Sequence, residues 1–155
     1  MLLGDILTKE QIISDLKASD RWEAIEELID NLVDCGKVRA EDRGAVAEVV
    51  KKREASMSTG IGFGVGIPHA STDLIYDVIG AFGRSTGGVD FEAHDNKPVN
   101  LVMLFLVPQG QFQKHLKTLA NIAKLLHSNE FRQALQNAKD AEEMEGLIKS
   151  QAAAK

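Results

Sequence analysis

Cysteine, long apolar runs and an excess of basic residues are all scarce or missing in this 155-residue chain. The one cysteine, Cys35, excludes an intramolecular disulfide and any C-x-x-C metal or redox pair, which suits a reducing compartment. The formal net charge is −5, so the chain lacks the broad basic footprint of a nucleic-acid-binding protein. We therefore expect no nucleic acid among its partners.

Targeting and membrane signals are also missing. The first ten residues, MLLGDILTKE, have neither a basic start nor an apolar run of signal-peptide length. The longest apolar stretch, LVMLFLVP at 101–108, is far too short to span a membrane. We expect a cytoplasmic protein without membrane insertion. The spacings among the four histidines match no metal motif, so we expect no metal. We also expect no cofactor.

The composition is that of an ordinary globular protein, with 44% hydrophobic and 26% charged residues. At this length the chain can form one domain with a sizeable core. No repeat, low-complexity tract or linker divides it. We therefore expect a single domain over 1–150, followed by a short tail over 151–155.

Hydrophobic periodicity predicts both helices and strands. Helices are expected at 19–38, 41–57, 111–128, 129–138 and 140–151. Strands are expected at 11–16, 74–83 and 99–108, the last one central because it is almost unbroken in apolarity. The segment 84–98 is expected to form turns and a short edge strand. Asp20 and Asp140, each followed three residues later by Glu, are predicted N-caps. Strands bracketed by helices predict an α/β fold with helices on both faces of a sheet.

The stretch STGIGFGVGIPHAST, residues 58–72, places glycines at alternate positions before a proline–histidine pair. It does not fit G-x-G-x-x-G, because no glycine stands three positions after the second, and it has no lysine for a Walker A loop. The alternation predicts one extended segment with an apolar face for the core, ending at Pro68 and presenting His69. The residues alone leave open whether this is a scaffold for His69 or a glycine-rich surface loop.

Two other residues invite a functional interpretation. His115 falls on one helical stripe with Leu119, Ile122 and Leu126, so it is either a satisfied core histidine or a polar group at the mouth of a pocket. Arg53 ends the helix before the glycine stretch and is either a solvated charge or a planar fork for phosphate oxygens. His94 and His127 are expected at the surface.

The segment REASMSTGIGFGVGIPHA, 53–70, resembles the active-site stretch of the mannitol/fructose-type enzyme IIA family. That family belongs to the bacterial phosphoenolpyruvate-dependent phosphotransferase system and includes nitrogen-regulatory members. HLKTLANIAKLL, 115–126, resembles the family helix that carries a second active-site histidine, and the resemblance extends over nearly the whole chain. Ala70 is a departure, because many members have glycine after the histidine.

The resemblance implies a mixed sheet and a phosphohistidine mechanism. His69 would be phosphorylated through Nε2, Arg53 would stabilise the equatorial oxygens, and His115 would hydrogen-bond the same oxygens. Ser58, Thr59 and Gly60 match the turn that supports the phosphate pocket. The glycines would then make room for a partner protein to approach His69.

The implied phosphate donor is an HPr-type protein, and the implied acceptor is a IIB domain or a regulatory target. Because no IIB domain or permease is found within the chain, we favour a free-standing regulatory, nitrogen-type IIA. A sugar-transport IIA that serves a separate IIB is the first alternative. A binding module that no longer transfers phosphate is the second.

Overall fold

The computed structural model describes the backbone of residues 3–153 and the side chains of residues 4–150. The longer helices are α2 (Arg21–Asp34), α3 (Arg43–Ser56), α4 (Phe112–Leu126), α5 (Asn129–Asn137) and α6 (Ala141–Ala153). The short helical elements are α1 (Leu3–Ile6), η1 (Lys9–Gln11) and η2 (Ala40–Asp42). The strands are β1 (Ile12–Ile13), β2 (Gly60–Gly62), β3 (Val65–Gly66), β4 (His69–Thr72), β5 (Ile79–Val89) and β6 (Val99–Pro108). Helix α6 continues into the predicted tail, and residues 154–155 lie outside the described residues.

The predicted caps and helix ends follow from local chemistry. The Glu23 backbone N–H donates to the Asp20 carboxylate at 2.9 Å, and the Glu143 N–H donates to Asp140 at 3.0 Å. These bonds satisfy backbone donors that the first turn of each helix leaves without partners. Helix α2 ends before Gly36, whose φ of 76° only glycine adopts without strain.

The six strands form one mixed sheet in the order β1-β5-β6-β3-β2, and β4 also pairs with β6. β6 is central, as predicted, and its side chains are almost all buried. β5 runs antiparallel to β6 on one side, whereas β3 and β4 lie one after the other along its other side, both parallel to it. The strand expected at 11–16 is reduced to β1.

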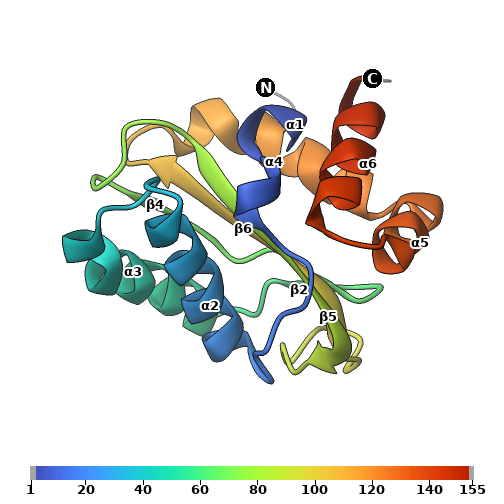
Figure 1. Ribbon diagram of the computed structural model, residues 1–155. Coiled ribbons are helices and arrows are strands. Elements are labelled where there is room, and N and C mark those ends of the chain that lie inside the picture. Colours follow the sequence, from blue (N-terminus) through green and yellow to red (C-terminus); the bar gives the residue numbers. More distant parts are fainter. Residues whose placement is uncertain (1–2, 154–155) are drawn as a thin grey trace.

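Helices cover both faces of this sheet (Figure 1). α2 and α3 pack on one face around a core that includes Ile25, Val46 and Leu104. α1, α4, α5 and α6 cover the other face, around a core that includes Phe105 and Ile122. The predicted α/β fold, a mixed sheet with helices on both faces in a single domain, is confirmed.

The strand predicted at 74–83 was wrong at both of its boundaries. β5 begins at Ile79 rather than at 74, and it continues to Val89 through a register irregularity after Arg84. The segment 84–98 was expected to form turns and a short edge strand, and its first part, 84–89, is instead the second half of β5. The polar and glycine-rich sequence of that segment gives no alternating pattern, although Arg84 and Val89 pair with Leu101 and Val99 of β6.

The single extended segment predicted for the glycine stretch is also wrong. The chain reverses between β2 and β3 in a tight antiparallel hairpin, where Gly62, Phe63 and Gly64 have φ values of 95°, 59° and 80°. Positive φ is what makes glycine necessary at this turn. The segment also does not stop at Pro68, because His69 opens strand β4.

Among residues 3–153, none of the helices combines the length and the apolarity that crossing a membrane requires.

Candidate functional site

The fold brings two of the predicted site residues, Arg53 and His69, into one open pocket of about 540 Å³. Arg53 comes from the last turn of α3 and His69 from the first position of β4. The pocket is lined by Val49, Lys52, Arg53, His69, Ala70, Ser71 and Phe112. The sheet therefore supplies a rigid floor for the histidine, and two helices supply the walls.

The His69 ring is fixed from two sides. Its Nδ1 lies 2.7 Å from the Ile67 carbonyl oxygen, and its ring is stacked on that of Phe112 with 6.1 Å between centroids. Because a carbonyl oxygen only accepts, Nδ1 carries the proton in the neutral ring. The other nitrogen, Nε2, then holds the lone pair and points away from the Ile67 carbonyl. This is the tautomer in which Nε2 is the nucleophile.

Burial lowers the pKa of His69 below its ordinary value of 6.5. The Ile67 carbonyl opposes this shift, whereas the positive charge of Arg53 lowers the pKa further and Glu54 raises it. The ring is therefore kept neutral at neutral pH, which leaves the Nε2 lone pair available for attack on an electrophile.

Arg53 is held by the end of its own helix. Its Nη1 donates to the Met57 carbonyl at 3.2 Å, and among residues 4–150 no carboxylate pairs with its side chain. Its remaining donors are thus available to an anion. A guanidinium without a protein counter-ion, beside a neutral imidazole, makes the pocket attractive for a phosphoryl group.

His115 lies apart from this lining. It is half-buried on α4, three residues after Phe112, and among residues 4–150 its side chain makes no hydrogen bond. Partial burial and the charge of Lys114 lower its pKa below 6.5. Of its predicted stripe, Ile122 and Leu126 are buried. His115 therefore sits at the solvent end of that stripe, and its contact with phosphate stays a prediction.

Ser58 and Thr59 use their hydroxyl protons inside the protein. Ser58 Oγ donates to the Phe91 carbonyl at 2.6 Å, and Thr59 Oγ1 donates to the Glu54 carboxylate at 2.6 Å. Gly60 lies against Ala93, where an added Cβ would come within 2.7 Å of the Ala93 Cβ. All three positions anchor the turn after α3, and their predicted support of a bound phosphate stays untested.

The orientation of the hairpin corrects a further prediction. Ile61 and Phe63, expected in the core, are 41% and 58% exposed, whereas Gly60 and Gly66 face inward. Gly66 lies so close to the Phe91 ring that an added Cβ would come within 2.9 Å of it. The inward-facing glycines therefore make room for the 91–93 segment of this chain.

Sequence reasoning missed Glu54, Ser71 and Phe112. Glu54 is 1% exposed and accepts hydrogen bonds from Thr59 and from Arg21. Its sequence neighbours give no hint of that burial. Ser71 could have been found from its spacing, because it stands two positions after His69 and residues two apart on a strand face the same side. Phe112 is the first residue of the helix that carries His115, and this closeness in sequence could have indicated Phe112 as a site residue.

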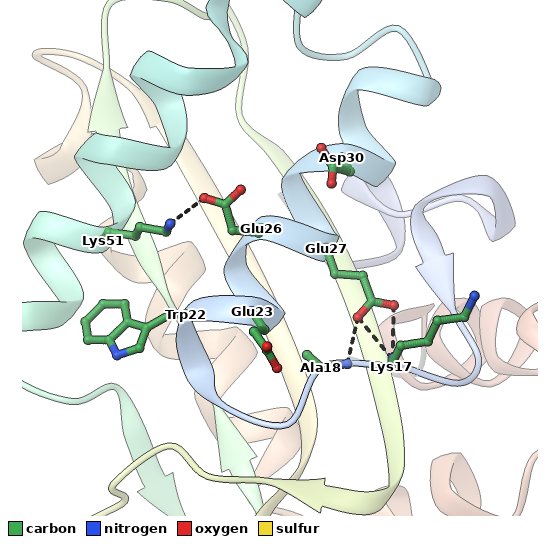
Figure 2. Close-up of a pocket in the computed structure, with 8 residues that line it drawn as sticks. All are labelled: Lys17, Ala18, Trp22, Glu23, Glu26, Glu27, Asp30 and Lys51. Atoms are coloured by element: carbon green, nitrogen blue, oxygen red, sulfur yellow. Dashed lines mark hydrogen bonds and ion pairs between the residues drawn. The ribbon is translucent and has the colours of Figure 1, made fainter.

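A second open pocket, of about 640 Å³, lies along α2 and involves none of the predicted site residues (Figure 2). Its carboxylates are occupied: Glu27 accepts from the backbone N–H groups of Lys17 and Ala18, and Glu26 pairs with Lys51 of α3. These bonds fix the loop before α2 and tie α2 to α3. In the described part of the chain, no three His, Cys, Asp or Glu side chains gather closely enough to hold a metal ion.

A neutral, half-buried imidazole beside a guanidinium that pairs with no carboxylate among residues 4–150, on an α/β scaffold, defines a candidate phosphoryl-accepting protein. Residues 5–151 match the family described as "Phosphoenolpyruvate-dependent sugar phosphotransferase system, EIIA 2". The chain belongs to this family, whose members are phosphotransferase components.

Both sugar-specific and nitrogen-regulatory proteins are similar to this chain. A "PTS system fructose-specific EIIA component" of Haloferax volcanii is 38% identical over 81% of this chain and 80% of its own length. A "Nitrogen regulatory protein" of Bradyrhizobium diazoefficiens is 33% identical over 96% of this chain and 95% of its own. The crystal structure of Nitrogen Regulatory Protein IIA-Ntr from Neisseria meningitidis superposes with a TM-score of 0.84, at 31% identity over 94% of this chain and 98% of that one.

Proposed function

We propose that this protein is a cytoplasmic phosphoryl carrier that accepts a phosphoryl group on Nε2 of His69 from an HPr-type donor. The observation that carries the proposal is the 2.7 Å contact between His69 Nδ1 and the Ile67 carbonyl, next to Arg53. That contact selects the ring tautomer and orientation that make Nε2 reactive.

The transfer step uses groups already in place. The Nε2 lone pair of His69 attacks the phosphorus of the donor's phosphohistidine, and the bond between phosphorus and the donor nitrogen breaks with its electron pair left on that nitrogen. Negative charge on the equatorial oxygens is stabilised by the free donors of Arg53. Positive charge that develops on the His69 ring is stabilised by the Ile67 carbonyl, which accepts from Nδ1–H.

Of the two roles known by name among the relatives, we propose the regulatory, nitrogen-type one. It is supported by the relative from Bradyrhizobium diazoefficiens and the structure from Neisseria meningitidis, each matched over almost its full length. A sugar-transport role, with transfer to a separate IIB protein, is the second candidate. It is favoured by the higher identity to the fructose-specific protein of Haloferax volcanii.

Loss of transfer in His69→Gln tests the proposal. The wild type, His69→Gln and the control His94→Gln, a change at an exposed histidine outside the pocket, are incubated with phosphoenolpyruvate, enzyme I and an HPr-type protein. We expect acid-labile, base-stable phosphate on the wild type and the control, and none on His69→Gln. Uptake by His69→Gln, or none by the wild type, would contradict the proposal. Phosphate uptake by the wild type would also exclude the binding-module alternative.

The same phosphorylated protein separates the two roles. Mixed with a fructose-type IIB protein, a sugar-transport IIA passes its phosphoryl group on within the time of its own phosphorylation. We expect the group to stay on His69 instead. Rapid transfer to the IIB protein would favour the sugar-transport role.

A further inference from the structure

Ser71 shares the pocket with His69 and Arg53. It stands two positions after His69 on β4, and both residues pair with the same neighbour strand, β6. Because alternate residues of a strand project to one face, the two side chains lie on the same side of the sheet. The hydroxyl is thus carried by the same rigid strand as the reactive imidazole.

The Ser71 hydroxyl has no hydrogen-bond partner among residues 4–150. This separates it from Ser58 and Thr59, whose hydroxyl protons are donated to Phe91 and Glu54. It also differs from Thr72, the next residue, which is buried and accepts from the Leu74 N–H at 3.2 Å. The Ser71 hydroxyl can therefore donate a hydrogen bond to a ligand, whereas the hydroxyls of Ser58 and Thr59 already donate within the protein.

The rest of the lining offers few other donors for a bound phosphoryl group. Val49, Ala70 and Phe112 have no side-chain donor. Besides His69 itself, the lining leaves two cations, Lys52 and Arg53, and one neutral hydroxyl. The cations supply charge from the α3 wall, whereas Ser71 would approach from the strand that forms the floor.

We propose that the Ser71 hydroxyl donates a hydrogen bond to an equatorial oxygen of the phosphoryl group as it is transferred to His69. This inference rests on the proposed function and adds to it a residue that contacts the reacting group. A hydrogen bond to a charged acceptor is stronger than one between neutral groups. Its loss should slow phosphoryl acceptance by about 10- to 100-fold.

The test compares single-turnover acceptance by the wild type, Ser71→Ala, Ser71→Thr and Ser14→Ala. Ser14 is a matched control, because it is half-buried, makes no side-chain hydrogen bond among residues 4–150 and lies outside the pocket. The phosphorylated HPr-type donor is varied in concentration so that the maximal rate and the half-saturating concentration are measured separately. Thermal melting is recorded for every variant.

We expect Ser71→Ala to lose maximal rate with unchanged half-saturation and melting temperature, and Ser71→Thr, which keeps the hydroxyl, to recover most of the rate. Equal rates for the wild type and Ser71→Ala would overturn the inference and leave the proposed function standing. A rate loss that Ser71→Thr does not repair, or that accompanies a lower melting temperature, would also overturn it. Failure of the wild type itself to accept phosphate would instead overturn the proposed function, and this inference with it.

Discussion

Replacing Glu54 by Ala should be among the most damaging single changes in this protein, although the residue is charged and stands two positions after the exposed Lys52. The Glu54 carboxylate is 1% exposed and accepts from the Thr59 N–H at 2.9 Å, the Thr59 hydroxyl at 2.6 Å and Arg21 Nη1 at 3.2 Å. Removing it leaves two buried Thr59 donors without acceptors and takes from Arg21 its buried partner. Arg21 keeps only its bond to the exposed Glu92, at 2.7 Å.

The expected cost follows from that loss. Removing one partner of a buried ion pair typically costs about 3–5 kcal/mol. For a domain of this length such a loss lowers the melting temperature by roughly 6–20 °C. Glu54→Gln keeps an oxygen for Thr59 but not the charge for Arg21, so we expect it to cost about 1–3 kcal/mol.

Urea unfolding followed by circular dichroism measures these differences. Glu48→Ala is the matched control, since it removes an exposed glutamate from the same helix that makes no ion pair among residues 4–150. We expect the control to unfold like the wild type. If Glu54→Ala were as stable as Glu48→Ala, the carboxylate would not hold the turn after α3 as described.

Three further predictions concern the pocket. Arg53→Lys keeps the charge but loses the planar fork, so transfer should slow by roughly 10- to 1000-fold in single-turnover assays with little change in stability; wild-type kinetics would remove its role. His115→Ala should stay folded, with a free energy of unfolding changed by about 1 kcal/mol or less, because the side chain is half-buried and makes no hydrogen bond among residues 4–150. We expect this variant to accept phosphate more slowly than the wild type. Unchanged kinetics would remove His115 from the site. Because the folded-state pKa of His69 lies below its ordinary value of 6.5, the unfolded chain binds the proton first. The contribution of the neutral ring to stability is therefore complete above pH 6.5 and is lost as the pH falls toward the folded-state pKa. In urea titrations at several pH values, His69→Gln should lose less stability than the wild type over that window. Equal losses in the two proteins would contradict the lowered pKa of His69.

Patterns local in sequence predicted much of the fold. The two capped helices were predictable because a side-chain acceptor and the N–H three residues later are all that such a cap requires. β6 was predictable because a strand buried on both faces must be apolar throughout. The β2–β3 hairpin was not, since alternating glycine and apolar residues fit one strand as well as two. The positive φ values at Gly62, Phe63 and Gly64 that make the turn do not follow from that alternation.

The site was predictable only where sequence neighbours determine it. His69 and Arg53, which line one pocket, were predicted from the resemblance of residues 53–70 to the enzyme IIA family. The hydroxyls of Ser58 and Thr59 are occupied because Phe91 and Glu54 accept from them. Phe91 lies more than thirty residues away from Ser58 along the chain. Which hydroxyl keeps its proton free therefore depends on tertiary packing that no local pattern encodes.

The atom that carries the phosphoryl group tests the central claim most directly. The protein, labelled with ¹⁵N in its histidine rings, is phosphorylated through enzyme I and an HPr-type donor, and the coupling between ³¹P and the ring nitrogens is recorded by NMR. The contact between Nδ1 and the Ile67 carbonyl predicts that phosphorus couples to Nε2 of His69, with Nδ1 still protonated. Coupling to Nδ1 of His69, or to a nitrogen of His115, would contradict it.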